Sequence, residues 1–280
     1  MMAKTATIEL KNVSYAYSEQ AKAIDSLSLR IGAGDRLALL GQNGSGKTTL
    51  AKILAGLIEP KAGQVFIDGQ NIQSLTTAQR VRTISYVFQN PDHQIFSPTV
   101  RQELAFGPKN LGLQGDELER RVDSTLRQFD LESLAEMSPA MLSYGLRRKL
   151  TVASVAALHS PILVLDEPSL GLDWGSATEM LDRLLEAEHA PRTLILISHD
   201  VDLAARYTQQ VALLAQGRLA EHGMLNALLA DEKIMRQHGL KSPAIAQLAA
   251  SLRRKGIPIK GVEVEAFSRN VASWLAEIPE

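Results

Sequence analysis

A glycine-rich loop in this chain ends in a lysine and a hydroxyl residue. Residues 41 to 48 read GQNGSGKT, which matches the phosphate-binding spacing G-x-x-x-x-G-K-[ST]. Glycines let backbone N–H groups face phosphate oxygens, and a following helix adds the positive end of its dipole. We expect Lys47 to reach the β- and γ-phosphates of a nucleotide and the Thr48 hydroxyl to coordinate Mg²⁺. The alternative is a chance glycine-rich turn, and the loop alone does not separate kinases, GTPases and motor ATPases.

Two carboxylates, Asp166 and Glu167, directly follow the apolar run Ile162 to Leu165. In open α/β sheets, ligands lie at the carboxyl ends of the strands. We expect Asp166 to hold Mg²⁺ through water and Glu167 to polarise the water that attacks a γ-phosphate, as a general base. A strand that ends in a solvated acidic turn is the alternative.

Two further segments carry groups suited to a phosphate site. Ser143 and Gly145 precede a Leu- and Ala-rich helical segment, so they should lie at a helix N-terminus, where anions bind. The triplet Ser198-His199-Asp200 follows the apolar run Leu194 to Ile197. Taken alone, Ser143 would be an ordinary helix cap and His199 a structural histidine. The combination with the loop and the carboxylates favours nucleotide hydrolysis.

Short apolar runs predict the strands that must position these groups. We expect strands at Ile8 to Val13, Leu27 to Ile31, Arg36 to Leu40, Ile84 to Phe88, Ile162 to Leu165 and Leu194 to Ile197. Continuous apolar runs are typical of strands buried on both faces of a parallel sheet that helices cover. Strands that alternate with helical stretches indicate an α/β fold.

The remaining segments read as helical. Leu113 to Ser160 is rich in Leu, Arg and Glu, which predicts an inserted helical subdomain, and composition alone indicates a turn-rich connector over 104–113. Ser242-Pro243 predicts the N-cap and first turn of a later helix. Two apolar stripes at helical spacing follow it: Ile245, Leu248, Ala249 and Leu252, then Phe267, Val271, Trp274, Leu275 and Ile278.

Composition limits the classes of function. The 280 residues carry 30 Lys+Arg and 31 Asp+Glu, a formal net charge of -1 that argues against a basic nucleic-acid-binding surface. Cysteine is absent, which excludes thiolate chemistry and suits a reducing compartment. The N-terminus lacks the apolar core of a secretory signal, and no apolar run approaches the roughly 18 residues of a membrane span. We expect any membrane association to come through a partner.

With these motifs in place, the chain resembles the nucleotide-binding subunits of ABC transporters between Tyr17 and His199. The resemblance implies an α/β P-loop NTPase with a RecA-like core sheet, an inserted α-helical subdomain, an N-terminal antiparallel β subdomain and a small helical C-terminal extension. It implies an ATP-binding domain over 1–230, with the helical subdomain at about 90–160, and the extension over 231–280. In this family two subunits enclose two nucleotides, each held by the loop of one chain and the signature of the other.

The resemblance also implies a role for each matching residue. Glu167, His199 and Gln89 are the expected catalytic residues: the base, the switch histidine at the γ-phosphate, and the glutamine that senses Mg²⁺. Tyr17 is expected to stack on adenine, although its neighbour Tyr15 leaves open that either one only packs the strand. The expected nucleotide contacts are Tyr17, Gly41, Gln42, Asn43, Gly44, Ser45, Gly46, Lys47, Thr48 and Thr49, with Ser143 and Gly145 acting in trans. The expected metal ligands are Thr48, Gln89 and Asp166, and the expected cofactors are ATP and Mg²⁺. Ser169 to Asp173 resembles the loop that touches the opposite subunit.

A narrower resemblance lies in two segments, VFQNPDHQ at 87–94 and LAFGPKNLGL at 104–113. They are similar to segments of the ATPases of energy-coupling factor importers, which take up vitamins or cobalt and nickel ions. This implies three partners: a second ABC ATPase subunit, a transmembrane coupling protein and a substrate-binding membrane protein, with no nucleic acid. It also implies a peripheral location on the cytoplasmic face of the cell membrane.

The signature departs from the family pattern, because Tyr144 and Leu146 stand where the family usually has Gly and Gln. The hypothesis that follows has two parts. This chain's own phosphate loop, Glu167 and His199 form a site that can hydrolyse ATP, whereas its signature serves the nucleotide on the opposite subunit less well. That asymmetry would suit a heterodimer of two related ATPases. The alternatives are a soluble ABC-type clamp acting on nucleic acid or ribosomes, the ATPase of another ABC transporter branch, and a P-loop kinase. A kinase would leave the signature, Gln89 and His199 without a role.

Overall fold

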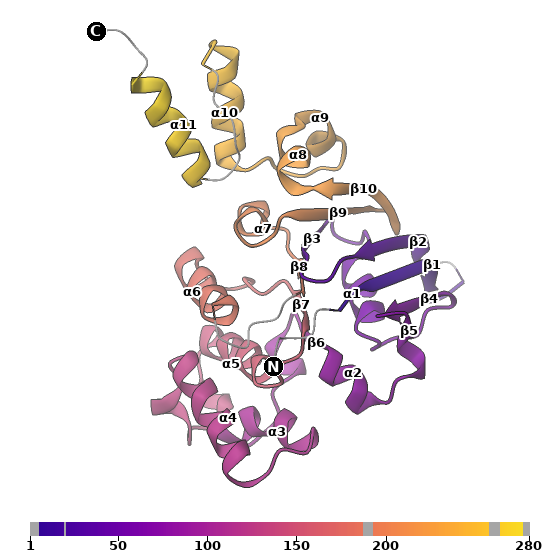
Figure 1. Cartoon of the computed structure of the whole chain (residues 1–280), viewed down its shortest axis with the longest axis vertical. Helices are drawn as coiled ribbons and strands as arrows, with labels where there is room; N and C mark the ends of the chain where they lie inside the picture. Colours follow the sequence, from indigo (N-terminus) through magenta and orange to yellow (C-terminus); the bar gives the residue numbers. More distant parts are fainter. Residues whose placement is uncertain (1–5, 20, 187–192, 258–263, 277–280) are drawn as a thin grey trace.

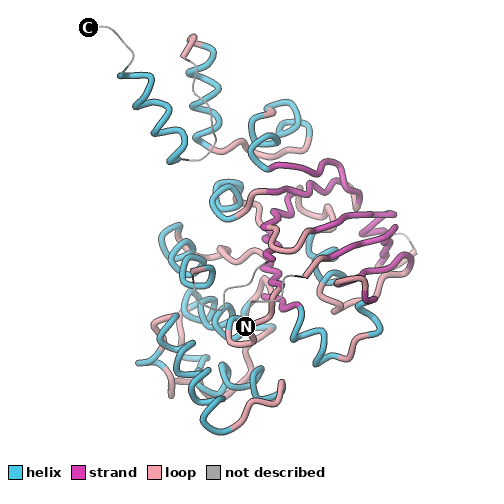
Figure 2. Tube along the Cα trace, viewed as in Figure 1, coloured by secondary structure: helices cyan, strands magenta, loops and turns pink. Residues whose placement is uncertain are grey.

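The chain folds around two β-sheets, drawn in magenta in Figure 2. The computed structural model describes residues 6–19, 21–186, 193–257 and 264–276. The larger sheet has the strand order β10-β9-β3-β8-β7-β6, and the smaller one has the order β2-β1-β4-β5. The strands are β1 (Ile8–Ala16), β2 (Lys22–Ile31), β3 (Arg36–Leu40), β4 (Ala62–Ile67), β5 (Gln70–Asn71), β6 (Ile84–Val87), β7 (Ile162–Asp166), β8 (Thr193–Ile197), β9 (Gln210–Ala215) and β10 (Arg218–Met224).

Helices surround both sheets (Figure 1). They are α1 (Lys47–Leu54), α2 (Thr77–Thr83), α3 (Val100–Asn110), α4 (Gly115–Gln128), α5 (Tyr144–Ala156), α6 (Trp174–Leu185), α7 (Val201–Tyr207), α8 (Leu225–Ala230), α9 (Glu232–Gln237), α10 (Ala244–Arg254) and α11 (Val264–Ala276).

The larger sheet is parallel except for its edge strand β10, which runs antiparallel to β9. Every residue of β7 and β8 is buried. One face of these strands, with Val164 and Ile195, packs against α1 and the smaller sheet. The other face, with Leu163 and Leu196, packs against α5 and α6. Burial on both faces explains the continuous apolar runs, and the predicted α/β fold is confirmed.

The smaller sheet is antiparallel, since β1 pairs with β2 and β4 in that sense. It comes from the N-terminal part of the chain and lies beside α1 on the right of Figure 1. The expected N-terminal antiparallel β subdomain is therefore present. The sequence did not predict β4, β5, β9 or β10.

Helices α3, α4 and α5 form a layer of their own at the lower left of Figure 1. The interpretation of 104–113 as a turn-rich connector is wrong, because 104–110 lie within α3. The physical reason is that one face of this helix, including Val100, Leu104 and Pro108, is buried. Burial of that face outweighs the poor helix propensity of Gly107 and Pro108.

The C-terminal part consists of α8 to α11, and α10 and α11 project from the top of Figure 1. Ala249 of α10 and Phe267 of α11 form the centre of a small apolar cluster. Ser242 does not cap α10 as expected: Pro243 occupies the N-cap position, and no side chain bonds to the first turn. Leu248 is exposed, whereas Val271 and Trp274 pack as expected. Ile278 and the side chain of Leu275 lie outside the described residues.

Within the described ranges, no helix combines the length and apolarity that crossing a bilayer requires.

The helical layer shares its apolar cluster with the core sheet, and Phe129 at the end of α4 is a fully buried member of that cluster. We expect Phe129→Ala to lower the free energy of unfolding by about 3–5 kcal/mol, because it removes apolar contacts and leaves a cavity. The control is Met141→Ala, at a side chain that is 78% exposed, where a change within about 0.5 kcal/mol is expected. Denaturant titration measures both. An equal effect of the two substitutions would contradict the placement of this cluster.

Candidate nucleotide-binding site

A cavity of about 560 Å³ opens between the glycine-rich loop, the connection from β1 to β2 with the first residues of β2, the segment after β6 and the end of β7. Nine of the predicted site residues line it: Tyr17, Asn43, Gly44, Gly46, Lys47, Thr48, Thr49, Gln89 and Glu167. The remaining wall comes from Ala21, Lys22 and Ala23. The structure thus brings together residues that lie far apart in the sequence: Tyr17 and Glu167 are separated by 150 positions (167 − 17).

The glycine-rich loop connects β3 directly to α1. Gly44 and Gly46 have φ angles of 78° and 104°, in the left-handed region that favours glycine. At Gly46 a Cβ atom would also lie 2.5 Å from the carbonyl oxygen of Ala23. Only glycine at position 46 therefore allows the loop to approach β2 this closely.

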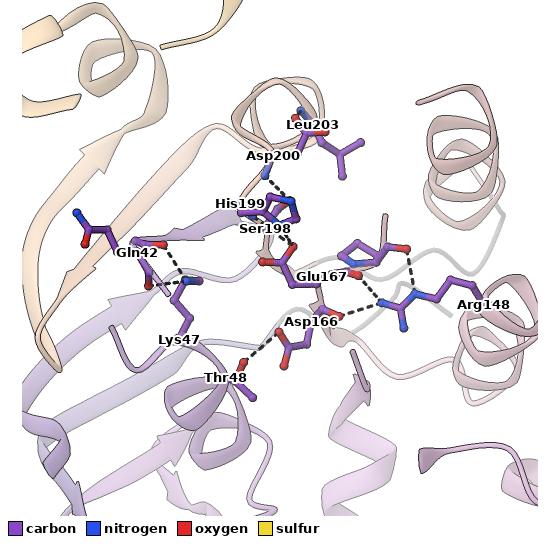
Figure 3. Close-up of polar contacts among 12 residues, drawn as sticks. Gln42, Lys47, Thr48, Arg148, Asp166, Glu167, Ser198, His199, Asp200 and Leu203 are labelled. Carbon is purple, nitrogen blue, oxygen red and sulfur yellow. Dashed lines mark hydrogen bonds and ion pairs between the residues drawn. The ribbon is translucent and has the colours of Figure 1, made fainter. Parts of the chain in front are cut away.

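Lys47 is buried, and its Nζ donates hydrogen bonds to the carbonyl oxygens of Gly41 (2.8 Å) and Gln42 (3.0 Å). Burial lowers the pKa of Lys47, and the nearby carboxylates of Glu167 and Asp166 act in the opposite direction. Lys47 is one of the residues that line the cavity, and its ammonium group points at the backbone of the loop (Figure 3). Gln42 belongs to the loop but does not line the cavity. Its side-chain Nε2 donates to the carbonyl oxygen of His238 at 3.2 Å.

Asp166 ends β7 and is fully buried. Its Oδ1 accepts a hydrogen bond from the Thr48 hydroxyl at 3.3 Å, and its Oδ2 accepts one from the Tyr86 hydroxyl at 2.6 Å. Burial raises the pKa of Tyr86, and the Asp166 carboxylate raises it further, so Tyr86 remains a donor. Within the described residues, no lysine, arginine or histidine forms an ion pair with this carboxylate.

Glu167 and His199 are in direct contact. The His199 Nδ1 lies 2.7 Å from Glu167 Oε2, and the His199 backbone N–H donates to the same oxygen at 3.3 Å. Glu167 is buried and has a φ of 49°, an uncommon conformation for a residue with a side chain. The imidazole is 61% exposed. The pair therefore presents a carboxylate to the cavity and an accessible ring beside it (Figure 3).

Ser143 and Gly145 do not line this cavity. Ser143 is the exposed N-cap of α5, and its Oγ accepts from the backbone N–H of Leu146 at 3.3 Å. The ring of Tyr144 lies against Gly171, where a Cβ atom would be 2.5 Å from Tyr144 Cε1. The bulkier signature residue is thus accommodated by the loop over 169–173 of the same chain.

Tyr17 and Tyr15 have different environments. Tyr17 is 61% exposed at the cavity, with its hydroxyl 3.1 Å from Thr49 Oγ1. Tyr15 is partly buried and packs against the core, edge-on to Tyr17. Of the two, only Tyr17 has a ring available to a ligand in the cavity.

Two residues of this site escaped the sequence analysis, Tyr86 and Arg148. Tyr86 donates to Asp166 from the neighbouring strand, and its signal was a hydroxyl, next to that of Ser85, among the apolar residues Ile84, Val87 and Phe88. Arg148 is fully buried in α5, and its guanidinium donates to backbone carbonyls on the far side of Asp166 and Glu167 from Lys47 (Figure 3). The sequence carries no pattern that separates Arg148 from the basic residues beside it.

Removing the Tyr86 hydroxyl tests the hydrogen bonding of Asp166. We expect Tyr86→Phe to lower the free energy of unfolding by about 1–3 kcal/mol, because a buried carboxylate oxygen loses its donor. Tyr15→Phe is the control, since the Tyr15 hydroxyl makes no hydrogen bond within the part of the chain that the structure describes. Denaturant titration compares the two. Equal stability of Tyr86→Phe and the unaltered chain would show that this contact contributes nothing.

Comparison with known proteins agrees with this geometry. A family model described as ABC transporter matches residues 24–170. The energy-coupling factor transporter ATP-binding protein EcfA of Methanothermobacter thermautotrophicus is 37% identical over 254 residues, which cover 90% of this chain and 82% of the relative. The EcfA of Methanocaldococcus jannaschii is 33% identical, with 96% and 98% covered. A putative ABC transporter ATP-binding protein of Methanosarcina acetivorans is 38% identical, but the chain spans only 41% of its length.

Among solved structures, cbiO1 from Clostridium perfringens, part of the ABC transporter complex cbiONQ, matches with a TM-score of 0.72 and 30% identity. That match covers 88% of this chain and 100% of cbiO1. A dimeric ATP-binding cassette bound to ADP and Pi matches with a TM-score of 0.70 and 26% identity over 78% of this chain and 98% of the cassette. Since the family model covers more than half of the 280 residues and the EcfA relatives align over most of both chains, this chain belongs to the ABC transporter family, as its motifs indicated.

Proposed function

We propose that this chain is the ATP-hydrolysing subunit of an energy-coupling factor importer. The observation that carries the proposal is the convergence of the phosphate loop and Glu167 on one cavity, with His199 in contact with Glu167, in a chain with EcfA relatives. The transported substrate is a vitamin or a cobalt or nickel ion, the classes that such importers take up. The similarity to cbiO1 supports the proposal, because cbiO1 is part of a transporter complex.

In this proposal the nucleotide lies in the cavity between Tyr17 and Glu167. Tyr17 offers an exposed ring for the adenine base, and such stacking is stabilising because both partners present aromatic faces. The loop over 41–48 and the start of α1 hold the phosphates through backbone N–H groups. Lys47, already inside the cavity wall, pairs with the β- and γ-phosphates.

The donor set around Asp166 fits a magnesium ion. Its buried carboxylate has hydroxyl partners but no ion-pair partner within the described residues, and Thr48 supplies a second oxygen beside it. Carboxylate and hydroxyl oxygens are the ligands that Mg²⁺ prefers. Thr48, Asp166 and Gln89 would hold the ion, which when bound would neutralise the charge that develops on the phosphate oxygens.

Glu167 is the general base of this mechanism. Its Oε2 contacts His199, so its other carboxylate oxygen remains to accept a proton from the attacking water. Because a carboxylate only accepts hydrogen bonds, His199 donates from Nδ1, and its Nε2 donates to a γ-phosphate oxygen when the ring carries a proton on both nitrogens. Transfer of the water proton to Glu167 accompanies formation of the new P–O bond and cleavage of the bond between the γ-phosphorus and the β–γ bridging oxygen, which leaves with ADP.

An exposed aromatic pair, Phe96 and Phe106, marks the surface proposed for the transmembrane coupling protein. The two rings stack edge-on with centroids 4.6 Å apart, and they are 64% and 47% exposed. The buried carboxylate of Glu103 accepts backbone N–H groups of Phe96 and Ser97, which fixes this loop on α3. The surface follows Gln89 closely in the chain, so a partner bound there could respond to the nucleotide site. The location that follows is peripheral, on the cytoplasmic face of the membrane.

The second ABC subunit completes each site in this proposal. Ser143 lies exposed outside its own chain's cavity, as required of a residue that contacts a nucleotide in trans. Tyr144 and Leu146 would make this contribution weaker, which favours a heterodimer of two related ATPases. Cooperative ATP hydrolysis by the purified chain alone, with both sites equally active, would contradict the heterodimer.

Glu167→Gln tests the proposed base. We expect ATP turnover to fall by about 10²–10⁴-fold, because the amide cannot accept the water proton. ATP binding should persist, and an ATP-bound dimer should accumulate in size-exclusion chromatography. Glu179→Gln, in α6, is the control and should leave turnover unchanged. Normal turnover in Glu167→Gln would remove Glu167 from this role.

The double substitution Phe96→Ser and Phe106→Ser tests the coupling surface. We expect binding to the membrane partners to weaken by roughly 30-fold, about 2 kcal/mol, as for buried aromatic anchors of an interface. The ATP turnover of the isolated chain should not change. Pull-down from solubilised membranes, with identification of the bound proteins, measures the effect. Leu57→Ser with Met224→Ser, an exposed pair elsewhere, is the control, and an equal loss in that control would contradict this surface.

A further inference from the structure

Arg148 lies in α5, and its side chain is fully buried. Among the described residues, its guanidinium donates to backbone carbonyl oxygens and to no side chain. Nε donates to Pro168 (3.0 Å), Nη1 to Gln89 (3.1 Å) and Phe88, and Nη2 to Asp166 (2.9 Å) and Glu167 (2.6 Å).

These five acceptors match the five N–H donors of a guanidinium, one on Nε and two on each terminal nitrogen. Nε makes one of these bonds, and Nη1 and Nη2 make two each. Removing a charge from water is costly unless hydrogen bonds compensate it, and here carbonyl dipoles supply that compensation in place of a carboxylate. An apolar side chain could fill the same volume, but it would leave five buried carbonyls without this donor.

The acceptors belong to two separate segments of the site. Phe88 and Gln89 follow β6, whereas Asp166 ends β7 and Glu167 and Pro168 follow it. Arg148 thereby joins the two strand ends to α5, the helix that Ser143 caps. It lies on the side of Asp166 and Glu167 opposite to Lys47 and Thr48 (Figure 3).

The backbone of Glu167 is held from both sides. Its carbonyl oxygen accepts from Arg148 (2.6 Å) and from the Leu170 N–H (3.2 Å), and its N–H donates to the carbonyl oxygen of Ile197 at 2.9 Å. These bonds hold the residue in the left-handed conformation with φ of 49°, and its side chain contacts His199. Without the Arg148 bonds, the Glu167 carbonyl would keep only the longer Leu170 bond, so the uncommon conformation would be less firmly held.

We propose that Arg148 is a positioning residue that fixes the Glu167 carboxylate and the Gln89 segment to α5, so that the base and the signature move together. The proposal rests on the function proposed above. In this proposal Arg148 does not contact the nucleotide. Replacing Arg148 should therefore slow the chemical step and leave ATP binding unchanged.

The test compares Arg148→Gln with Arg121→Gln in the full chain. Arg121 is a matched control, because it is a partly buried arginine that donates to one backbone carbonyl, that of Ala157 (2.6 Å), within the same helical layer. We expect Arg148→Gln to lower kcat by about 10- to 100-fold, the scale of a 1 Å misplacement of a catalytic group. The KM for ATP should stay within about twofold. Arg121→Gln should change neither constant.

Arg148→Lys is the second variant, since it keeps the charge but donates from one nitrogen. An intermediate kcat is expected. A kcat of Arg148→Gln within twofold of the unaltered chain, or a loss confined to KM, would overturn the proposal. So would an equal kcat loss in Arg121→Gln, or failure of both Arg148 variants to fold while Arg121→Gln folds, because either result would indicate a general structural role.

A readout independent of turnover separates this proposal from the proposed function. The imidazole NMR signals of His199 report its contact with Glu167, and they should shift in Arg148→Gln but not in Arg121→Gln. If the unaltered chain hydrolyses no ATP, the proposed function fails, whereas a shifted His199 signal would still support the positioning by Arg148. Unchanged His199 signals in Arg148→Gln would overturn it.

Discussion

Parallel pairing of β3, β8, β7 and β6 determines where the reactive side chains of this protein lie. Leu39 is in register with Ile197, Ile197 with Asp166, and Leu165 with Val87, so the four strands end side by side. Each strand leads into a segment with a polar group: the loop that contains Lys47, then His199, Glu167 and Gln89. A shift of one residue in this register would turn Asp166 to the other face of the sheet. The site therefore depends on apolar strands that carry no chemistry themselves.

The same edge of the sheet buries Lys47, Asp166 and Arg148, and these three have partners that also order the site. Asp166 accepts from Thr48 and Tyr86, Lys47 donates to the loop carbonyls, and Arg148 donates to the strand ends. Buried polar groups without partners would be destabilising by an amount comparable to a lost hydrogen bond. The need to satisfy them couples stability to function here, because the groups that complete these bonds also fix the directions of Thr48 and Glu167.

Local patterns predicted the α/β fold, the glycine-rich loop and the Asp-Glu strand end, because backbone geometry at these points depends on residues adjacent in sequence. The family resemblance added Gln89, Tyr17 and the antiparallel sheet. Tyr86 and Arg148 were missed, since their partners lie 80 and 18 or more positions away and only tertiary packing brings them together. The helix over 104–110 was missed because burial of one face overrides the weak helix propensity of glycine and proline.

The central claim is that the cavity between Tyr17 and Glu167 is half of an ATP site that a second subunit completes. The most direct measurement is a structure of the Glu167→Gln chain with ATP, Mg²⁺ and its partner ATPase. We expect the phosphates on the loop over 41–48, the base at Tyr17, and the γ-phosphate covered by the signature of the other subunit. A nucleotide bound elsewhere, or one fully enclosed by a single chain, would contradict the claim.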